Sequence, residues 1–259
     1  VLVPPQFLPN VQPPLSFHMS RKLLWSCTPG GIGASQLTLR VTDGDPLPLA
    51  PSVAAAWSRA VAVAASAAAA RGVGAPRLSN QTKYGLVSVS SDATTGKLHL
   101  EASLACYAQH VVHRSGTVDP SVCPPPRLLG LSTLIRGSNF SIAMRRSASV
   151  ATHAGQTDVF GGHPEPAHLL PRCTDDEIPE DLPATRSAIL DAVARTDGIV
   201  PGDRLFQDAL AEVEEETGLE RLLDKGAMRL VGLGEVEAKP ELFFWCPLLP
   251  HVTRADVIE

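Results

Sequence analysis

The stretch Asp203–Leu219 reads DRLFQDALAEVEEETGL and has the features of a complete amphipathic helix. Asp203 is a suitable N-cap, because its side chain can accept a hydrogen bond from an unpaired backbone N–H. Gly218 is a suitable end, since glycine adopts the left-handed conformation at little cost, and neither Pro nor Gly lies between the two. The apolar residues recur at the spacing of one helical face; they are Leu205, Phe206, Ala209, Leu210 and Val213.

Three carboxylates of this stretch, Glu212, Glu215 and Glu216, lie beside the apolar face rather than opposite it. Asp208 points into the same arc, whereas Glu214 points toward solvent. Like charges at this spacing repel one another, so a cation would stabilise the group, and oxygen ligands suit Mg²⁺ or Mn²⁺ better than zinc. For the helix taken alone, a solvated acidic face is the alternative interpretation.

The acidic half of the stretch resembles a family motif. Glu212–Leu219, EVEEETGL, fits the second half of the Nudix box, E-U-x-E-E-x-G-U with U aliphatic, at every position. Upstream, Asp158–Pro166 reads DVFGGHPEP and resembles the strand and Gly-Gly turn that open the Nudix loop. Its GGHPEP string is similar to the UDP-glucose pyrophosphatase branch of the Nudix hydrolases. The resemblance covers roughly residues 84–250.

The chain departs from the common box at three places. Gly162 and Glu212 lie about fifty positions apart, so the loop between them carries a large insertion. Ala211 occupies the position of the box Arg, and His168 occupies that of the Glu expected six residues after the Gly. The UDP-sugar branch also has a lengthened loop and no Arg, so the departures fit that branch while weakening any transfer of roles from the broad family.

The resemblance implies an α/β (α+β) fold of the Nudix type, in which a mixed β-sheet is sandwiched between helices. Alternating strand and helix patterns favour the same class. We expect an N-terminal extension over residues 1–80, with a Pro-rich arm, a Gly-rich loop and an Ala-rich helix, and a Nudix domain with an enlarged loop over 81–259. Period-two alternation predicts a hairpin over 84–104 and a final strand pair over 228–248.

The activity that the resemblance implies is Mg²⁺-dependent hydrolysis of a UDP-sugar, UDP-glucose or UDP-galactose, to UMP and a sugar 1-phosphate. Glu212, Glu215 and Glu216 are the expected catalytic residues and metal ligands, and the carbonyl of Gly161 is a further expected ligand. Mn²⁺ is the possible replacement for Mg²⁺.

Substrate contacts are expected from Gly162, His163 and Glu165, although Glu165 has the alternative of being an acid on a surface turn. The general base is left open among the three helix glutamates, Glu165, and a strand glutamate, Glu235 or Glu237. His110 and His113 lie three residues apart without a nearby third ligand; we interpret them as surface or packing side chains.

The amino-acid composition limits the kinds of binding partner and the cellular compartment that we expect for the chain. The formal net charge of −5 disfavours a nucleic-acid partner. The five cysteines are scattered without a C-x-x-C motif, which argues against a disulfide framework or structural zinc and favours a reducing, cytoplasmic setting. The sequence contains no run of about 20 strongly apolar residues, which a membrane-spanning helix would require. The missing initiator Met suggests that the sequence is not a complete reading frame.

Three alternatives to the UDP-sugar assignment stay open. The first is a Nudix hydrolase that acts on another substrate, such as ADP-ribose or a dinucleotide. The second is a Nudix-derived binding module without catalysis. The Ala211 and His168 departures favour the binding module, whereas the retained pair Glu215–Glu216 argues against it. The third alternative is an unrelated globular protein with an acidic helix. Oligomeric state, nucleobase preference and sugar preference are not determined by the sequence.

Overall fold

The computed structural model describes residues 6–8, 21–27, 30–42, 50–70, 80–121, 124–145, 157–171, 179–236 and 239–258 of the 259-residue chain. Most of the predicted Pro-rich arm lies outside these ranges, as does Glu237. Strands and helices occur in mixed order along the described ranges, which confirms the α+β class.

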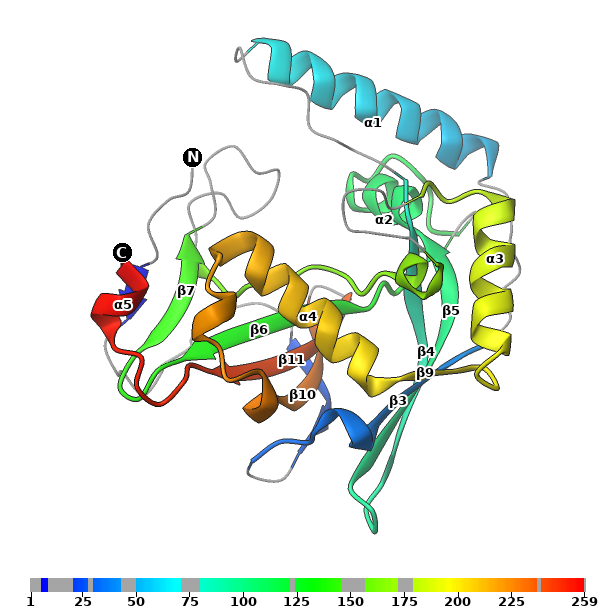
Figure 1. Cartoon of the computed structure of the whole chain (residues 1–259). Coiled ribbons are helices and arrows are strands. Elements are labelled where there is room, and N and C mark those ends of the chain that lie inside the picture. Colours follow the sequence, from blue (N-terminus) through cyan, green and yellow to red (C-terminus); the bar gives the residue numbers. More distant parts are fainter. Residues whose placement is uncertain are drawn as a thin grey trace.

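Within the described residues the strands form two mixed sheets. Sheet A consists of β1 (Gln6–Leu8), β2 (Arg21–Ser26), β6 (Gly130–Arg136), β7 (Ser141–Arg145), β8 (Thr157–Asp158), β10 (Arg229–Val236) and β11 (Lys239–Pro247). Its order is β1-β7-β6-β11-β10-β2, with β8 paired to β7. Sheet B consists of β3 (Leu37–Val41), β4 (Thr82–Asp92), β5 (Lys97–Cys106) and β9 (Ile199–Pro201), in the order β4-β5-β3-β9. In Figure 1, β6 and β11 of sheet A lie to the left of β4 and β5 of sheet B.

The helices lie around these sheets. The α-helices are α1 (Pro51–Ala70), α2 (Tyr107–Arg114), α3 (Pro183–Ala194), α4 (Gly202–Thr217) and α5 (Arg254–Ile258). Short 3₁₀ turns are η1 (Ala34–Gln36), η2 (Pro166–Leu169), η4 (Glu220–Leu222) and η5 (Lys225–Ala227). The predicted hairpin is present as β4 and β5, the final strand pair as β10 and β11, and the Ala-rich helix as α1.

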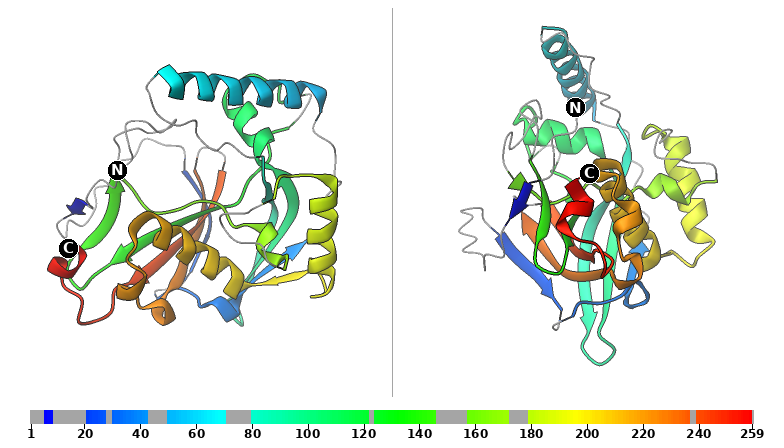
Figure 2. Two further views of the ribbon diagram at one scale, coloured as in Figure 1. Left: turned by 45° about the horizontal axis from the view of Figure 1, so that its top comes forward. Right: turned by 60° about the vertical axis from the view of Figure 1, so that its left-hand side comes forward.

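The pairing differs from the single mixed sheet that the sequence predicts. Strand β2 pairs with β10 in sheet A, and β3 pairs in parallel with β5 and antiparallel with β9 in sheet B. The segment assigned to an N-terminal extension therefore supplies β1 and β2 to sheet A and β3 to sheet B. Only α1 lies at the periphery, where Val53 and Ala56 pack against Val112 of α2 (Figure 2).

Helix α4 lies across sheet A and begins beside sheet B (Figure 1), where it contacts both β3 and β9. The segment after β8 runs along β6 and then reaches η2, which contacts β4 and α3. One helix and one connecting segment thus bridge the two sheets, and they carry all the residues predicted to form the functional site.

Candidate active site

Helix α4 directs its predicted apolar face into the core. Its buried apolar side chains are Leu205, Phe206, Ala209 and Val213. Phe206 packs edge-on against Phe244 of β11, with ring centroids 5.0 Å apart. The helix ends as predicted at Gly218, which has φ 66° and donates its backbone N–H to the Glu214 carbonyl at 2.8 Å. This packing fixes which side of α4 carries the carboxylates.

The predicted N-cap of α4 is wrong. The helix begins at Gly202, with Pro201 as the N-cap residue in an extended conformation, φ −60° and ψ 145°. Proline favours this conformation because its ring fixes φ, so the helix starts two residues earlier than the polar pattern suggests. Asp203 therefore lies in the first turn, where its carboxylate still interacts favourably with the helix dipole.

The Gly161–Gly162 pair lies between β6 and α4. The Leu131 N–H of β6 donates to the Gly162 carbonyl at 3.0 Å. A Cβ on Gly161 would overlap the Leu131 backbone carbonyl, so glycine is required there. A Cβ on Gly162 would overlap the Glu212 carboxylate, which would have to move aside. The Gly-Gly turn and Glu212 are in contact despite their separation in sequence.

The three predicted carboxylates differ in burial. Glu212 and Glu216 are half-buried, whereas Glu215 is exposed. Burial, together with the negative charges of Glu216, Glu215 and Glu165, raises the pKa of Glu212 to about 7. Glu214 instead forms an ion pair with Lys225, as suits a residue outside the acidic arc. The glutamates are electrostatically coupled, and the coupling is repulsive.

The donor set fits a hard divalent cation in its chemistry. Carboxylates and a backbone carbonyl are the ligands that Mg²⁺ and Mn²⁺ prefer, and a cation would relieve the repulsion that raises the Glu212 pKa. In the part of the chain that the structure describes, however, no three His, Cys, Asp or Glu side chains are gathered as a preassembled metal site.

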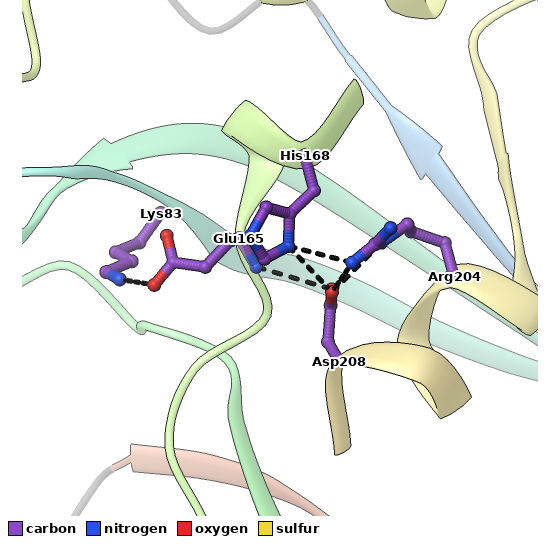
Figure 3. Close-up of polar contacts among 5 residues, drawn as sticks. All are labelled: Lys83, Glu165, His168, Arg204 and Asp208. Atoms are coloured by element: carbon purple, nitrogen blue, oxygen red, sulfur yellow. Dashed lines mark hydrogen bonds and ion pairs between the residues drawn. The ribbon is translucent and has the colours of Figure 1, made fainter. Parts of the chain in front are cut away.

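Asp208 forms a buried polar network that joins α4 to the connecting segment (Figure 3). Its Oδ1 accepts hydrogen bonds from Arg204 Nε at 2.9 Å and from Arg204 Nη2, and lies 3.0 Å from His168 Nδ1. Its Oδ2 accepts the backbone N–H of Glu165 at 3.3 Å. Asp208 is only 3% exposed. The network links the GGHPEP segment to α4 at Asp208, which lies one helical turn before Glu212.

Glu165 is buried, so the alternative of a surface turn acid is wrong. Its Oε1 forms an ion pair with Lys83 of β4 (Figure 3). Lys83 also donates a hydrogen bond to Gln81 Oε1 at 2.9 Å. Burial raises the pKa of Glu165, while the charge of Lys83 opposes the rise. Glu165 is thereby linked on one side to sheet B and, through its backbone, to Asp208.

His163 lies in a cluster of three rings. Its ring centroid is 5.9 Å from that of Tyr107 and 6.3 Å from that of His110, both on α2. Burial and the charge of Lys239 lower the pKa of His163 and hold its imidazole neutral near pH 7. The structure thus brings the predicted substrate residues Gly162, His163 and Glu165 to one side of the α4 glutamates. Glu235 is instead 3.6 Å from Arg127, Oε1 to Nε.

Sequence reasoning missed Arg204, Lys83 and the role of Asp208. Asp208 falls in the carboxylate arc, but its partners Glu165 and His168 precede it by 43 and 40 residues. Lys83 stands in an alternating strand pattern that gives no indication of its buried partner. No local spacing predicts such long-range polar contacts.

Comparison with known proteins gives no family for the chain: no family model matches it, and no curated protein matches its sequence. Of the helices described, none combines the length and apolar character needed to cross a membrane.

Proposed function

We propose that this chain is a Mg²⁺-dependent hydrolase of the Nudix type that cleaves the diphosphate of a UDP-sugar, UDP-glucose or UDP-galactose. Water would attack one phosphorus, the bridging P–O bond would break, and the products would be UMP and a sugar 1-phosphate. The contact between Gly162 and Glu212 carries the proposal. It joins the two parts of the motif that the sequence separates by some fifty residues, in the pairing that the resemblance implies.

The α4 glutamates and the Gly161 carbonyl would hold the metal ion in this proposal. When bound, Mg²⁺ offsets the negative charge of the diphosphate and lowers the pKa of bound water. A carboxylate that does not bind the ion would accept the proton of the attacking water. Because Lys83 engages one oxygen of Glu165, an α4 glutamate is the better candidate for this base. The raised pKa of Glu212, about 7, supports an α4 glutamate in this role, because such a group can take up a proton near neutral pH.

A cytoplasmic setting is part of the same proposal. Cys27, Cys106 and Cys246 are free thiols, and burial raises the pKa of Cys106 to about 11 and that of Cys246 to about 12. Unreactive buried thiols are compatible with a reducing compartment. The net charge of −5 makes a nucleotide-sugar a better-suited partner than a nucleic acid, since the latter requires a basic surface.

The direct test is an incubation of the full chain with UDP-glucose, UDP-galactose or ADP-ribose, in Mg²⁺ or in EDTA, with chromatographic detection of UMP or AMP. We expect UMP from the UDP-sugars in Mg²⁺ and no product in EDTA. Glu216→Gln should reduce turnover, whereas Glu220→Gln, on the exposed turn after α4, should not.

Other outcomes choose between the alternatives. Release of AMP from ADP-ribose without UMP would keep the hydrolase but change its substrate. Metal-dependent binding of a nucleotide-sugar without turnover would identify a binding module. Neither binding nor turnover with any of the three compounds would end the proposal.

A further inference from the structure

The ring cluster of Tyr107, His110 and His163 is continuous with the acidic site but differs from it in chemistry. Tyr107 and His110 stack with an interplanar angle of 28° and a centroid distance of 6.2 Å. His163 meets both rings at steep angles of 74° and 67°. All three residues are half-buried, and Nε2 of His163 is itself a buried atom. His163 directly follows Gly162, whose backbone touches Glu212.

Two buried polar atoms next to this cluster have no hydrogen-bond partner among the described residues. They are His163 Nε2 and Glu165 Oε2, on alternate residues of one short segment. Buried polar atoms in folded proteins are nearly always paired with protein, water or ligand. The neutral imidazole offers one donor and one acceptor, and the carboxylate oxygen accepts. The segment therefore presents one unsatisfied acceptor, Glu165 Oε2, and one ring nitrogen, His163 Nε2, that donates or accepts according to the tautomer.

Two lysines near the rings are each paired with a carboxylate, and Arg114 of α2 is a further charge near Tyr107 and His110. Lys83 pairs with Glu165, and its ammonium lies 5.8 Å from the Tyr107 ring centroid. Lys239 pairs with Glu241 at 2.8 Å, and its side chain lies over the bare backbone of Gly130. The rings thus adjoin paired lysines, in contrast to the repelling glutamates of α4.

From these contacts we propose that Tyr107, His110 and His163 form a subsite for the sugar ring of the substrate, with His163 Nε2 and Glu165 Oε2 bonding its hydroxyl groups. The inference rests on the proposed function, because it places the diphosphate at the α4 glutamates and the sugar beyond Gly162. A sugar hydroxyl both donates and accepts, and the C–H face of a sugar packs on flat rings. The subsite matches an uncharged polyhydroxyl group in both respects.

A phosphate group suits this cluster less well. The two lysines that could attract a phosphate are already paired with carboxylates, and a phosphate would lie near the unpaired carboxylate oxygen of Glu165. A subsite for the sugar predicts that the enzyme distinguishes sugar-bearing ligands from sugar-free ones at the ring cluster, and that the nucleoside is held elsewhere.

The test is isothermal titration of the full chain, in Mg²⁺, with glucose 1-phosphate and separately with UMP. The variant His163→Phe keeps a flat ring but removes Nε2. His110→Ala, which removes one of the rings on which the sugar would pack, is the second variant should the first not fold. The control is His251→Phe, since His251 is exposed beyond the end of β11. Loss of one or two hydrogen bonds should weaken glucose 1-phosphate binding by about tenfold and leave UMP binding unchanged.

The outcomes separate the subsite from the reaction. Selective weakening of glucose 1-phosphate supports the subsite even if no substrate is hydrolysed. Equal weakening of both ligands, weakening of UMP alone, or no change in either variant overturns it, even if UDP-glucose is hydrolysed. Failure of glucose 1-phosphate to bind the unaltered chain overturns it as well.

Discussion

The backbone N–H of Glu165 donates to Oδ2 of Asp208 at 3.3 Å, and this bond links two segments 43 residues apart. Asp208 lies one helical turn before Glu212 on α4, and Glu165 lies three residues after Gly162. The bond therefore helps to set the position of Gly162 against the Glu212 carboxylate. Arg204 and His168 complete the network around Asp208 (Figure 3). Asp208 acts as a positioning residue rather than as a reacting group.

Replacing Asp208 with Asn should loosen this connection. The amide nitrogen would face donors from Arg204 or Glu165, and the Arg204 charge would lose its partner. We expect a decrease of about 2–4 kcal/mol in the free energy of unfolding, measured by urea denaturation. Amide hydrogen exchange should also accelerate over residues 160–169.

The matched control is Asp203→Asn, in the exposed first turn of the same helix. It removes only a favourable interaction with the helix dipole, about 0.3–1 kcal/mol. Equal losses in the two variants would show that Asp208 has no special structural role.

The local structure of α4 is readable from sequence because its determinants are local. The apolar spacing places Leu205 and Val213 in the core, and the left-handed preference of glycine places the helix end at Gly218. The start is harder to predict because Pro201 and Asp203 both mark helix beginnings, and the polar pattern alone does not decide between them.

The pairing of the strands depends on contacts between residues that are distant in sequence. The spacing of residues within one segment does not predict such contacts. Strand β2 pairs with β10, which lies more than 200 residues later in the sequence, and β3 pairs in parallel with β5, some 60 residues later. The Gly162–Glu212 contact is expected only through a family resemblance, whereas nothing in the sequence indicates the Asp208 and Lys83 contacts. Buried polar pairs depend on the final arrangement of the chain, which the local pattern does not specify.

Replacing Gly162 with Ala should disable the site without unfolding the chain. The added Cβ would occupy the place of the Glu212 carboxylate, which lies at the end of a flexible side chain and can move. We expect a loss of activity or of Mg²⁺ affinity of about 10- to 100-fold, with the thermal midpoint nearly unchanged. UMP release and Mg²⁺ titration measure the two effects.

Gly33→Ala is the control, because a Cβ at that position would have no atom within 4 Å and the φ of Gly33 is negative. Full activity in Gly162→Ala would mean that the contact with Glu212 has no functional consequence.

The raised pKa of Glu212 predicts a pH-dependent loss of stability. Its pKa is about 7 in the folded chain, against an ordinary value near 4.5. The folded state binds the proton more tightly, so the unfolding free energy falls as pH rises from about 4.5 to about 7. The full penalty, at most about 3 kcal/mol, is present above pH 7.

Glu212→Gln removes this penalty because the amide does not ionise. We expect the variant to exceed the unaltered chain in unfolding free energy at pH 8 and to match it at pH 4, by urea denaturation without metal. Glu220→Gln, on an exposed turn, should show no such crossover. Added Mg²⁺ should stabilise the unaltered chain more than the variant. A constant difference across pH would contradict a raised pKa at Glu212.

The buried pair of Lys83 and Glu165 should behave differently from the exposed pair of Lys225 and Glu214. Lys83→Met leaves the Glu165 carboxylate buried without its cation, so we expect a decrease of about 3–5 kcal/mol in unfolding free energy at pH 7. The loss should shrink at low pH, where Glu165 becomes protonated. Lys225→Met should change stability by less than about 1 kcal/mol, because water screens the exposed pair. The double variant Lys83→Met/Glu165→Met should recover most of the loss, and a double variant as unstable as Lys83→Met would place the cause in packing rather than in the unpaired charge.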